Sequence, residues 1–269
     1  MNKSNVITDQ ELFFNQNSLA GKKEFTKNIF YYYANKEQIE GFNWIEDKKN
    51  ILEYGCGSGT SLDIFFEARN LEEYFFYGVD IAEQAVKKAK EYYPGYTFYK
   101  IKDNKIPQIE DGTLDAAFML HVLHHSFDHE DIFSEIYQKL KPGGKFFLSD
   151  LSSNNIFIRL GRNIFALFPA FFKNKFPDDL VVDGKIPEKY PVDYQKVAML
   201  LRDTGFEVQE IGHGHVFFFL FGWLDRFVPL TKVKHLTSIY PKIMKLEERL
   251  LKHNLFKKQA EVFYIKSVK

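Results

Sequence analysis

The residues with the clearest chemical meaning form a glycine-rich loop, Gly55-Cys56-Gly57-Ser58-Gly59, which follows the short segment 50–54. Glycines at alternate positions allow positive φ angles, and they let a ligand approach the backbone closely. The segment before the loop predicts a strand, and residues 61–70 predict a helix. A loop between a strand and a helix lies at the carboxyl edge of a parallel sheet, where open α/β folds bind their ligands. We therefore predict a ligand site at this loop, with an ordinary tight turn as the alternative.

An acidic residue, Asp80, ends the next predicted strand, about 20 residues after Gly59. In nucleotide-binding sheets, an acid at this offset accepts the hydroxyl groups of a ribose. Asp80 is also placed to cap the helix predicted over residues 82–92, a role that aspartate fills well. The two roles are compatible, and we favour the ribose. The glycine spacing is G-x-G-x-G and not the dinucleotide-binding G-x-G-x-x-G, so the sequence disfavours a nicotinamide-dependent oxidoreductase.

Four histidines follow a strongly apolar run, at positions His121, His124, His125 and His129. Three of them share a face at i, i+4 spacing on a helix, but no cysteine lies nearby to complete a metal-ligand pattern, so we predict no metal site. A histidine whose pKa is near neutrality can take a proton from a bound substrate. His125, His124 and also Asp150 are therefore the candidate catalytic bases. The alternative, that they line or cap a pocket without proton chemistry, stays open.

The elements that position these residues alternate regularly along the first part of the chain. Strands are predicted over 50–54, 74–79, 96–101, 114–120 and 145–148, and helices over 61–70, 82–92 and 131–140. This alternation predicts a parallel sheet built from right-handed crossover units. After residue 150 the pattern becomes irregular, with helices over 193–203 and 241–252 and strands over 206–211 and 260–266.

Three motifs in the same order resemble those of class I S-adenosylmethionine-dependent methyltransferases, of the type 11 kind. Ile51–Gly59 resembles the family's glycine motif, the segment from Asp111 to His125 resembles its fourth-strand motif, and Leu140–Lys145 resembles the turn before its fifth strand. The resemblance covers about residues 49–150. It implies a Rossmann-like α/β fold: a seven-stranded, mostly parallel sheet with helices on both faces and the last strand antiparallel, plus aromatic-rich cap inserts.

The resemblance also implies S-adenosylmethionine as the cofactor and assigns roles to individual residues. Glu53 is expected to orient the glycine loop and to lie near the ammonium group of the cofactor. The other cofactor-binding residues implied are Gly55, Cys56, Gly57, Gly59, Leu120 and His121 for the methionine part, Asp80 for the ribose, and Ile81, Asp103 and Asn104 for the adenine. The segment Gln108-Ile109-Glu110 matches the family loosely, which makes the adenine contacts the weakest part of the match.

The predicted domain organisation is an N-terminal helical cover over residues 1–48 and a methyltransferase domain over 49–269, with inserts at about 152–190 and 212–258. Much of the phenylalanine, 29 residues in all, lies outside the motifs. Extra core, an apolar lid over the substrate and peripheral contact with a membrane are three interpretations of the inserts that stay open.

The composition limits the partners and the compartment. Lys+Arg and Asp+Glu balance at 36 each, so a zero net charge argues against nucleic acid as the partner. One cysteine permits no internal disulfide and suits a reducing compartment, and no signal-like or membrane-spanning apolar run is seen, so we expect a cytoplasmic protein. The composition leaves the oligomeric state open.

Taken together, the sequence predicts methyl transfer to a small-molecule or lipid-like acceptor, with a hydroxyl oxygen favoured. The segment Leu120-His121-Val122-Leu123 stands where amino methyltransferases of nucleobases carry an Asn-Pro-Pro-Tyr-like motif, which argues against that acceptor class. The alternative from another functional class is a non-catalytic S-adenosylmethionine-binding protein, a sensor or an assembly subunit, because an intact cofactor pocket does not by itself establish catalysis.

Overall fold

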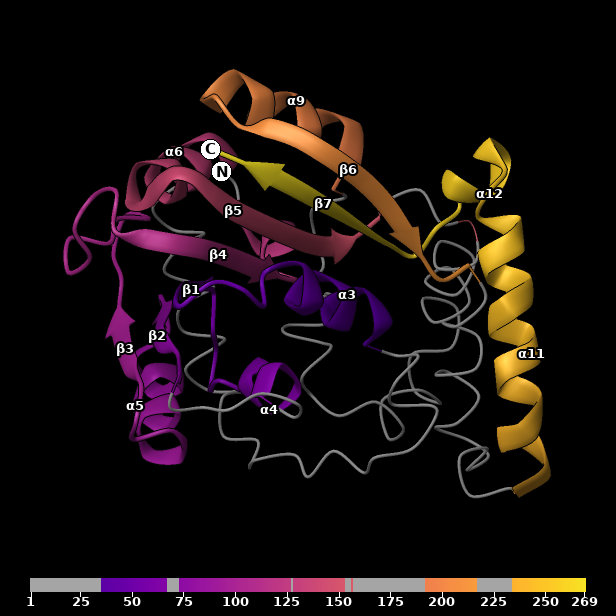
Figure 1. Cartoon of the computed structure of the whole chain (residues 1–269), viewed down its shortest axis with the longest axis horizontal. Helices are drawn as coiled ribbons and strands as arrows, with labels where there is room; N and C mark the ends of the chain where they lie inside the picture. Colours follow the sequence, from indigo (N-terminus) through magenta and orange to yellow (C-terminus); the bar gives the residue numbers. More distant parts are fainter. Residues whose placement is uncertain (1–34, 67–72, 127, 153–155, 157–191, 217–233) are drawn as a thin grey trace, which may run out of the picture.

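The computed structural model describes residues 35–66, 73–126, 128–152, 156, 192–216 and 234–269 (Figure 1). The predicted N-terminal cover up to residue 34, most of the first predicted insert and residues 217–233 of the second lie outside the described residues. Within the described residues, no helix is long and apolar enough to cross a membrane.

Seven strands form one sheet in the order β3-β2-β1-β4-β5-β7-β6. The strands are β1 Asn50–Tyr54, β2 Phe75–Asp80, β3 Thr97–Lys100, β4 Leu114–Leu120, β5 Leu140–Leu151, β6 Glu207–Gly214 and β7 Val262–Val268. Strands β1 to β5 pair in parallel, and β7 is antiparallel to both β5 and β6. This topology confirms the predicted fold class.

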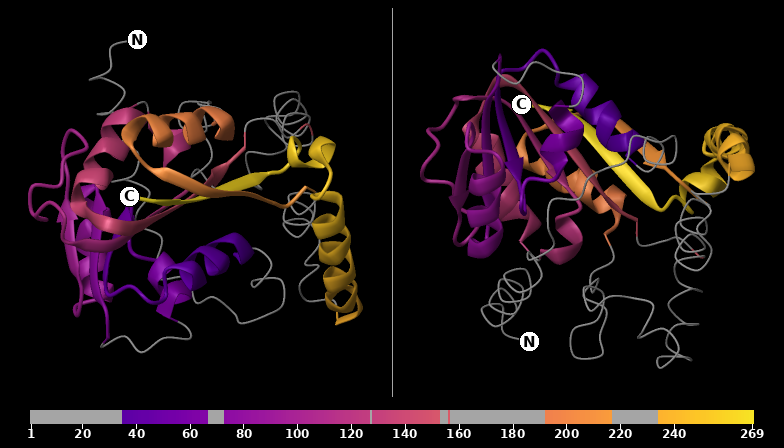
Figure 2. Two further views of the ribbon diagram at one scale, coloured as in Figure 1. Left: turned by 45° about the horizontal axis from the view of Figure 1, so that its top comes forward. Right: turned by 90° about the horizontal axis from the view of Figure 1, so that it is seen from below.

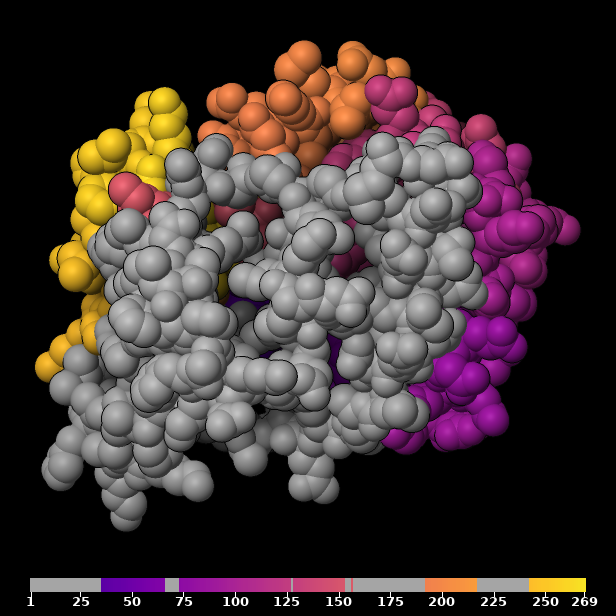
Figure 3. Space-filling view, turned by 180° about the vertical axis from the view of Figure 1, so that it is seen from behind, coloured from indigo at the N-terminus to yellow at the C-terminus, as the bar shows by residue number. Residues whose placement is uncertain are grey.

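Helices cover both faces of the sheet (Figure 2). One face carries α3 Lys36–Trp44, α4 Ser61–Phe66 and α5 Glu83–Tyr92; the other carries α6 His129–Lys139 and α9 Tyr194–Thr204. The C-terminal helices α11 Lys234–Leu250 and α12 Asn254–Lys257 stand at the end of the sheet toward which β4 and β5 point (Figure 1). Seen from behind, the α11–α12 segment and the β2–α5–β3 region lie on opposite sides of the molecule (Figure 3).

The two-residue period of the strands divides the core into two clusters. Leu52, Met119 and Leu148 belong to the cluster that includes residues of α6 and α9. Their neighbours, such as Phe118 and Phe147, belong to the cluster with α3, α4 and α5. Side chains of successive strand residues point to opposite faces, so apolar runs in β4 and β5 supply both clusters at once. Burial of each large side chain stabilises the fold by about 1.5–3 kcal/mol.

Two predicted boundaries in the C-terminal half were wrong. The sequence predicted that helix α11 starts at Pro241, because proline favours the first helical position. In the structure, α11 begins earlier, at Lys234. A proline inside a helix removes one hydrogen bond and disfavours the turn before it, yet α11 continues on both sides of Pro241. Strand β6 runs on to Gly214, into the region predicted as an insert, because it pairs with β7 as far as Val262.

A buried histidine links three elements at the end of the sheet. His215 Nε2 lies 3.0 Å from Glu37 Oε1 of α3, and its Nδ1 lies 3.8 Å from Glu247 Oε2 of α11. The backbone N–H of Val216 also donates to Glu247 Oε1, at 2.8 Å. Burial alone lowers the pKa of His215, but the two carboxylates outweigh burial and raise it to about 10. The charged imidazole therefore ties α3 and α11 to the end of β6.

We expect His215→Ala to lower the free energy of unfolding by about 3–5 kcal/mol, because it leaves two buried carboxylates without their cation. The raised pKa fixes the sign of the pH dependence. The contribution of His215 is fully present below its ordinary pKa of 6.5 and is lost as the pH rises toward 10. Denaturant unfolding at pH 6 and pH 9.5 measures this. A difference between wild type and variant that does not shrink at the higher pH would contradict the assignment.

A second stability prediction concerns the close packing of α3 on β5. A Cβ atom at Gly41 would lie 2.2 Å from the ring of buried Phe147, so Gly41→Ala forces the helix or the ring to move. We expect a loss of about 1–3 kcal/mol, which lowers the melting temperature by several degrees. Gly95→Ala is the matched control, because a Cβ there meets no atom within 4 Å. Equal melting temperatures for the two variants would show that α3 does not pack this tightly.

Candidate functional site

The glycine loop that follows β1 has the backbone conformation that its composition predicts. Gly55, Gly57 and Gly59 have φ angles of 77°, 51° and 82°. The carbonyl of Val79 accepts hydrogen bonds from the N–H groups of Gly55 (2.8 Å) and Cys56 (3.0 Å), which ties the loop to the end of β2. A Cβ at Gly57 would meet no protein atom within 4 Å, so the backbone there is open to a ligand.

Asp80, the last residue of β2, holds the loop from the other side. Its Oδ2 accepts from the N–H of Gly57 at 2.8 Å, and its Oδ1 accepts from the N–H of Ala82 at 2.8 Å, where α5 begins. Burial raises the pKa of Asp80, although these N–H groups oppose the rise. The N-cap of α5 is Ala82, and no side chain caps this helix, so the capping role considered for Asp80 from the sequence is wrong; the bond to the Ala82 N–H instead fixes the chain just before the helix. Each oxygen accepts only one of these two bonds and keeps lone-pair capacity toward a ligand.

Two cavities adjoin at this loop. The Asp80 cavity encloses about 200 Å³ and is lined by Tyr54, Gly55, Gly57, Asp80, Ile81, Ile101, Asp103, Asn104, His121, Val122, His125, Ser126, Asp128 and Ile132. The Glu53 cavity encloses about 260 Å³ and is lined by Asn35, Gln38, Glu53, Gly55, Cys56, Gly57, Thr60, Ser61, Ile64, Leu120 and His121. Both cavities use Gly55, Gly57 and His121. One extended ligand can therefore occupy both.

The predicted cofactor-binding residues come from different strands and loops, and the fold brings most of them to these two cavities. Gly59 is absent from both linings; a Cβ there would lie 2.9 Å from the ring of Tyr93, so its positive φ and this close packing explain the glycine. Asn35 and Gln38 of α3 were not predicted as site residues, because they precede the motif region and carry no local signal.

The turn after β3 places Asp103 and Asn104 beside the Asp80 cavity. Both residues have positive φ angles, 52° and 59°, a conformation that is uncommon for residues other than glycine. The hydroxyl of Tyr54 donates to Asn104 Oδ1 at 3.1 Å, which links this turn to β1. Neighbouring structure therefore holds the turn in its strained form.

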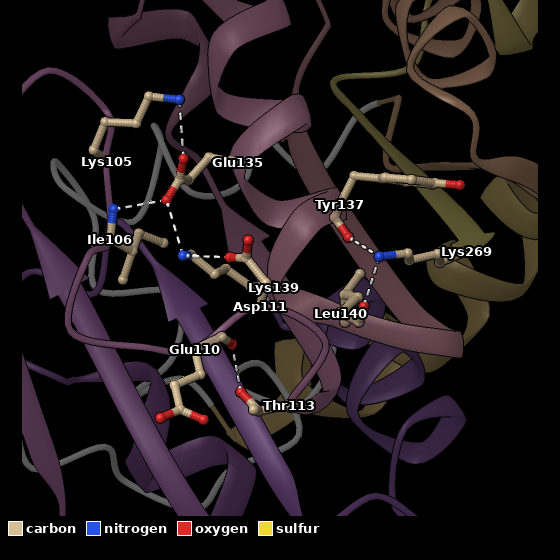
Figure 4. A network of polar contacts seen from close by, with 10 residues as sticks. All are labelled: Lys105, Ile106, Glu110, Asp111, Thr113, Glu135, Tyr137, Lys139, Leu140 and Lys269. Atoms are coloured by element: carbon tan, nitrogen blue, oxygen red, sulfur yellow. Dashed lines mark hydrogen bonds and ion pairs between the residues drawn. The ribbon is translucent and has the colours of Figure 1, made fainter.

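Glu135 of α6 supports the same turn from behind (Figure 4). Its Oε1 accepts from the N–H of Ile106 at 2.8 Å, and its Oε2 accepts from Nζ of Lys105 at 3.0 Å. Lys139 lies between Glu135 and Asp111, 2.7 Å from the Asp111 carboxylate. Burial raises the pKa of Glu135, but these donors outweigh it and lower the pKa overall. Glu135 was not predicted as a site residue. An acidic residue among the buried residues of an amphipathic helix is the feature that could have pointed to it.

The end of β4 leads into the histidine segment. His121 has a φ of 56°, and its N–H donates to the carbonyl of Ser149 at 2.8 Å. His129 Nε2 donates to the carbonyls of Leu123 and Ser126, 3.0 Å from each, so His129 closes the turn over 123–126. Within the described residues, no three side chains of the histidine, cysteine or acidic types are placed to hold a metal ion.

The three predicted catalytic residues lie together but differ in access to the cavities. Asp150 is 0% exposed, and its carboxylate receives His124 Nδ1 at 2.6 Å, the N–H of Leu123 at 2.7 Å and the N–H of Leu151 at 2.6 Å. Burial raises the pKa of Asp150, but these donors outweigh it and keep the pKa below its ordinary value. Of the three, only His125 lines the Asp80 cavity.

The ring of His125 packs against the ring of His124, with 3.8 Å between centroids. Burial, together with His124, lowers the pKa of His125 to about 3. His125 is therefore uncharged at neutral pH, and in the free protein it is a weaker base than a histidine that titrates near neutrality. The neutral imidazole of His125 thus lies at the cavity wall and packs against His124, whose ring is held by the buried carboxylate of Asp150.

Glu53, at the glycine loop, is the least satisfied polar group of the site. It is 3% exposed, and its Oε1 accepts from the Ser61 hydroxyl at 2.5 Å, while its Oε2 has no hydrogen-bond partner. Burial raises its pKa to about 8. A buried polar atom without a partner at a cavity is the kind of group that a ligand satisfies. The donor set and the open glycine backbone therefore fit a ligand with a nucleoside part and a cationic amino-acid part.

Comparison with protein families matches residues 52–148 to the family described as methyltransferase domain. Phosphoethanolamine N-methyltransferase 2 of Caenorhabditis elegans is 30% identical over 121 residues, which cover 42% of this chain and 26% of that protein. A ubiquinone biosynthesis O-methyltransferase of Pseudomonas paraeruginosa is 27% identical over 178 residues, which cover 63% of this chain and 71% of that protein.

Among solved structures, phosphoethanolamine N-methyltransferase 2 of Haemonchus contortus, in complex with S-adenosyl-L-methionine, superposes with a TM-score of 0.57 at 15% identity. The match covers 98% of this chain and 56% of that chain. The Caenorhabditis and Haemonchus proteins are therefore much longer than the region they share with this chain. Residues 52–148 therefore match the methyltransferase-domain family, and the sheet around them has the fold of S-adenosylmethionine-dependent methyltransferases of known structure.

Proposed function

We propose that this protein transfers the methyl group of S-adenosylmethionine to a hydroxyl oxygen of a small-molecule or lipid-like acceptor. The observation that carries the proposal is the pair of adjoining cavities at the glycine loop. One contains a carboxylate fixed at the end of β2, and the other contains a buried carboxyl group with an unpartnered oxygen. An extended nucleoside–amino acid ligand satisfies both.

We assign the nucleoside part to the Asp80 cavity. Asp80 retains acceptor capacity on both oxygens, which suits two neighbouring ribose hydroxyls. Ile81 and Ile101 supply apolar surface for a base, and Asp103 and Asn104 supply polar groups at its edge. These roles agree with those that the family resemblance implies.

We assign the amino-acid part to the Glu53 cavity. The unpartnered oxygen of Glu53 suits an ammonium group, and the side chains of Gln38 and Thr60 supply donors for a carboxylate. Leu120 and His121 close the wall next to the glycine loop. In this arrangement Asn35 and Gln38 of α3 join the cofactor site.

S-adenosylmethionine, when bound, supplies a methyl group on a sulfonium sulfur, and on transfer the carbon–sulfur electron pair stays on sulfur. A hydroxyl acceptor loses its proton as its oxygen bonds to the methyl carbon. We assign the receipt of that proton to His125, because it is the one of the three candidate bases that lines the Asp80 cavity. His124 and Asp150 act as positioning residues, since both are buried and Asp150 fixes the His124 ring.

The two relatives differ in the acceptor atom: one is named for N-methylation and the other for O-methylation. A hydroxyl oxygen must lose its proton when it is methylated, and the imidazole of His125 in the cavity wall suits that step, so we favour oxygen as the acceptor atom. We further propose a cytoplasmic protein that acts without nucleic acid, and a peripheral membrane contact through the phenylalanine-rich inserts for a lipid-like acceptor. The rival proposal, a binding protein without catalysis, predicts cofactor affinity with no turnover on any acceptor.

Asp80→Ala is expected to weaken binding of S-adenosylhomocysteine at least tenfold, which equals about 1.4 kcal/mol, because the ribose loses its acceptors. Calorimetric titration measures the affinity, and a melting curve checks that the loop remains folded. Asp111→Ala is the matched control, because Asp111 lies outside both cavities and pairs with Lys139 instead. Unchanged affinity in a folded Asp80→Ala protein would rule out the ribose assignment.

His125→Ala is expected to reduce turnover by about 10²–10⁴-fold, because it removes the proton acceptor. Affinity for S-adenosylhomocysteine should change only a few-fold. The assay follows transfer of labelled methyl groups to hydroxylated aromatic lipids and, in parallel, to phosphoethanolamine. Turnover within a few-fold of wild type on an oxygen acceptor would show that His125 has no role in proton transfer, and preferential methylation of the amine would contradict the proposed acceptor atom.

A further inference from the structure

The Glu53 carboxyl group is buried without a cation. It receives one hydrogen bond, from Ser61 at the start of α4, and no ion pair within the described part of the chain reaches it. Its Oε2 is enclosed and has no partner. A carboxylate in this state is costly, because burial removes hydration and nothing replaces it.

The groups around Glu53 do not relieve this cost. Asp80, from the end of β2, carries like charge and raises the pKa of Glu53 further, whereas Ser61 opposes the rise only in part. Asp63 of α4, which accepts from the Tyr93 hydroxyl at 2.8 Å, adds no positive charge.

The other elements that line the cavity add no cationic side chain either. Asn35 and Gln38 of α3 are neutral amides, Thr60 is a hydroxyl, and Cys56 of the glycine loop is a buried thiol whose pKa is raised by burial. His121, at the end of β4, is the one further titratable group in the lining within the described residues. Within the described residues, no lysine or arginine lines this cavity to balance an ionised Glu53, and a cationic ligand can supply that charge.

We infer that Glu53 holds a proton in the free protein and releases it when the ammonium group of the cofactor enters the cavity, so that cofactor binding is coupled to loss of a proton. This inference rests on the proposed function. The O–H bond of Glu53 breaks, the proton passes to solvent, and the ligand's ammonium group supplies the compensating charge. Below the pKa of about 8, binding then requires deprotonation, so affinity rises with pH toward that value.

The coupling gives Glu53 a role in selecting the ligand. A ligand that carries the ammonium group gains an ion pair in a low-dielectric cavity, whereas a ligand without it leaves Glu53 protonated. Methylthioadenosine makes this comparison directly, because it keeps the adenosine and the thioether of S-adenosylhomocysteine but lacks the amino-acid part.

The test is calorimetric titration with S-adenosylhomocysteine at pH 6.5 in two buffers of different ionisation enthalpy, which gives the number of protons released. We expect close to one proton for wild type and close to none for Glu53→Gln. Methylthioadenosine should release close to none from wild type. Between pH 6 and pH 7 the wild-type affinity for S-adenosylhomocysteine should rise nearly tenfold, and that of Glu53→Gln should stay flat.

Failure of the inference and failure of the proposed function give different results. Tight binding of S-adenosylhomocysteine without proton release, or equal release with Glu53→Gln, would overturn the inference and leave the proposed function standing. No binding by wild type at any pH would overturn both. If Glu53→Gln does not fold, the wild-type protein still tests the inference. Equal proton release with S-adenosylhomocysteine and with methylthioadenosine would contradict a role for the ammonium group.

Discussion

The carboxylate of Asp80 is the contact on which the geometry of this site depends. It accepts the N–H of Gly57 and the N–H of Ala82, so one side chain connects the loop after β1 to the start of α5. The adjacent carbonyl of Val79 accepts two further N–H groups of the same loop. A glycine-rich chain is conformationally free and loses much entropy when it is ordered. The three hydrogen bonds that the loop itself donates, from Gly55, Cys56 and Gly57, fix it in a form that leaves its backbone open to a ligand.

Three carboxyl groups lie at the carboxyl edge of the sheet, Glu53 and Asp150 buried and Asp80 half-buried, and their different partners give them different properties. Asp150, on β5, receives three donors, and its pKa is lowered. Asp80 receives two N–H groups, and burial still raises its pKa. Glu53 receives one hydroxyl, and its pKa rises to about 8. The same functional group is thus a fixed anion in one place and a proton carrier in another, because hydrogen bonding to the charged form opposes desolvation to a different extent at each.

Helix α3 connects this site to the end of the sheet. Its residues Asn35 and Gln38 line the Glu53 cavity, while Glu37 pairs with His215 and Gly41 packs against Phe147. The buried ion pairs of His215 and the close packing at Gly41 therefore determine where the amide side chains of α3 lie. Structure outside the glycine motif therefore determines which side chains of this segment line the proposed cofactor site.

The amino-acid sequence by itself determined the fold class and most of the cofactor side of the site. Apolar runs of fixed period predict the strands, and the glycine spacing with Asp80 predicts the ligand loop, since these signals depend on residues that are neighbours in the chain. Only the tertiary structure decided which predicted residues share a cavity. It separated His125, which lines the cavity, from His124 and Asp150 behind it. It also showed that, among the described residues, no cation pairs with Glu53, and that Glu135 supports the turn that contains Asp103 and Asn104. Burial and hydrogen bonding between distant segments set these properties, and a local sequence pattern contains no information about either.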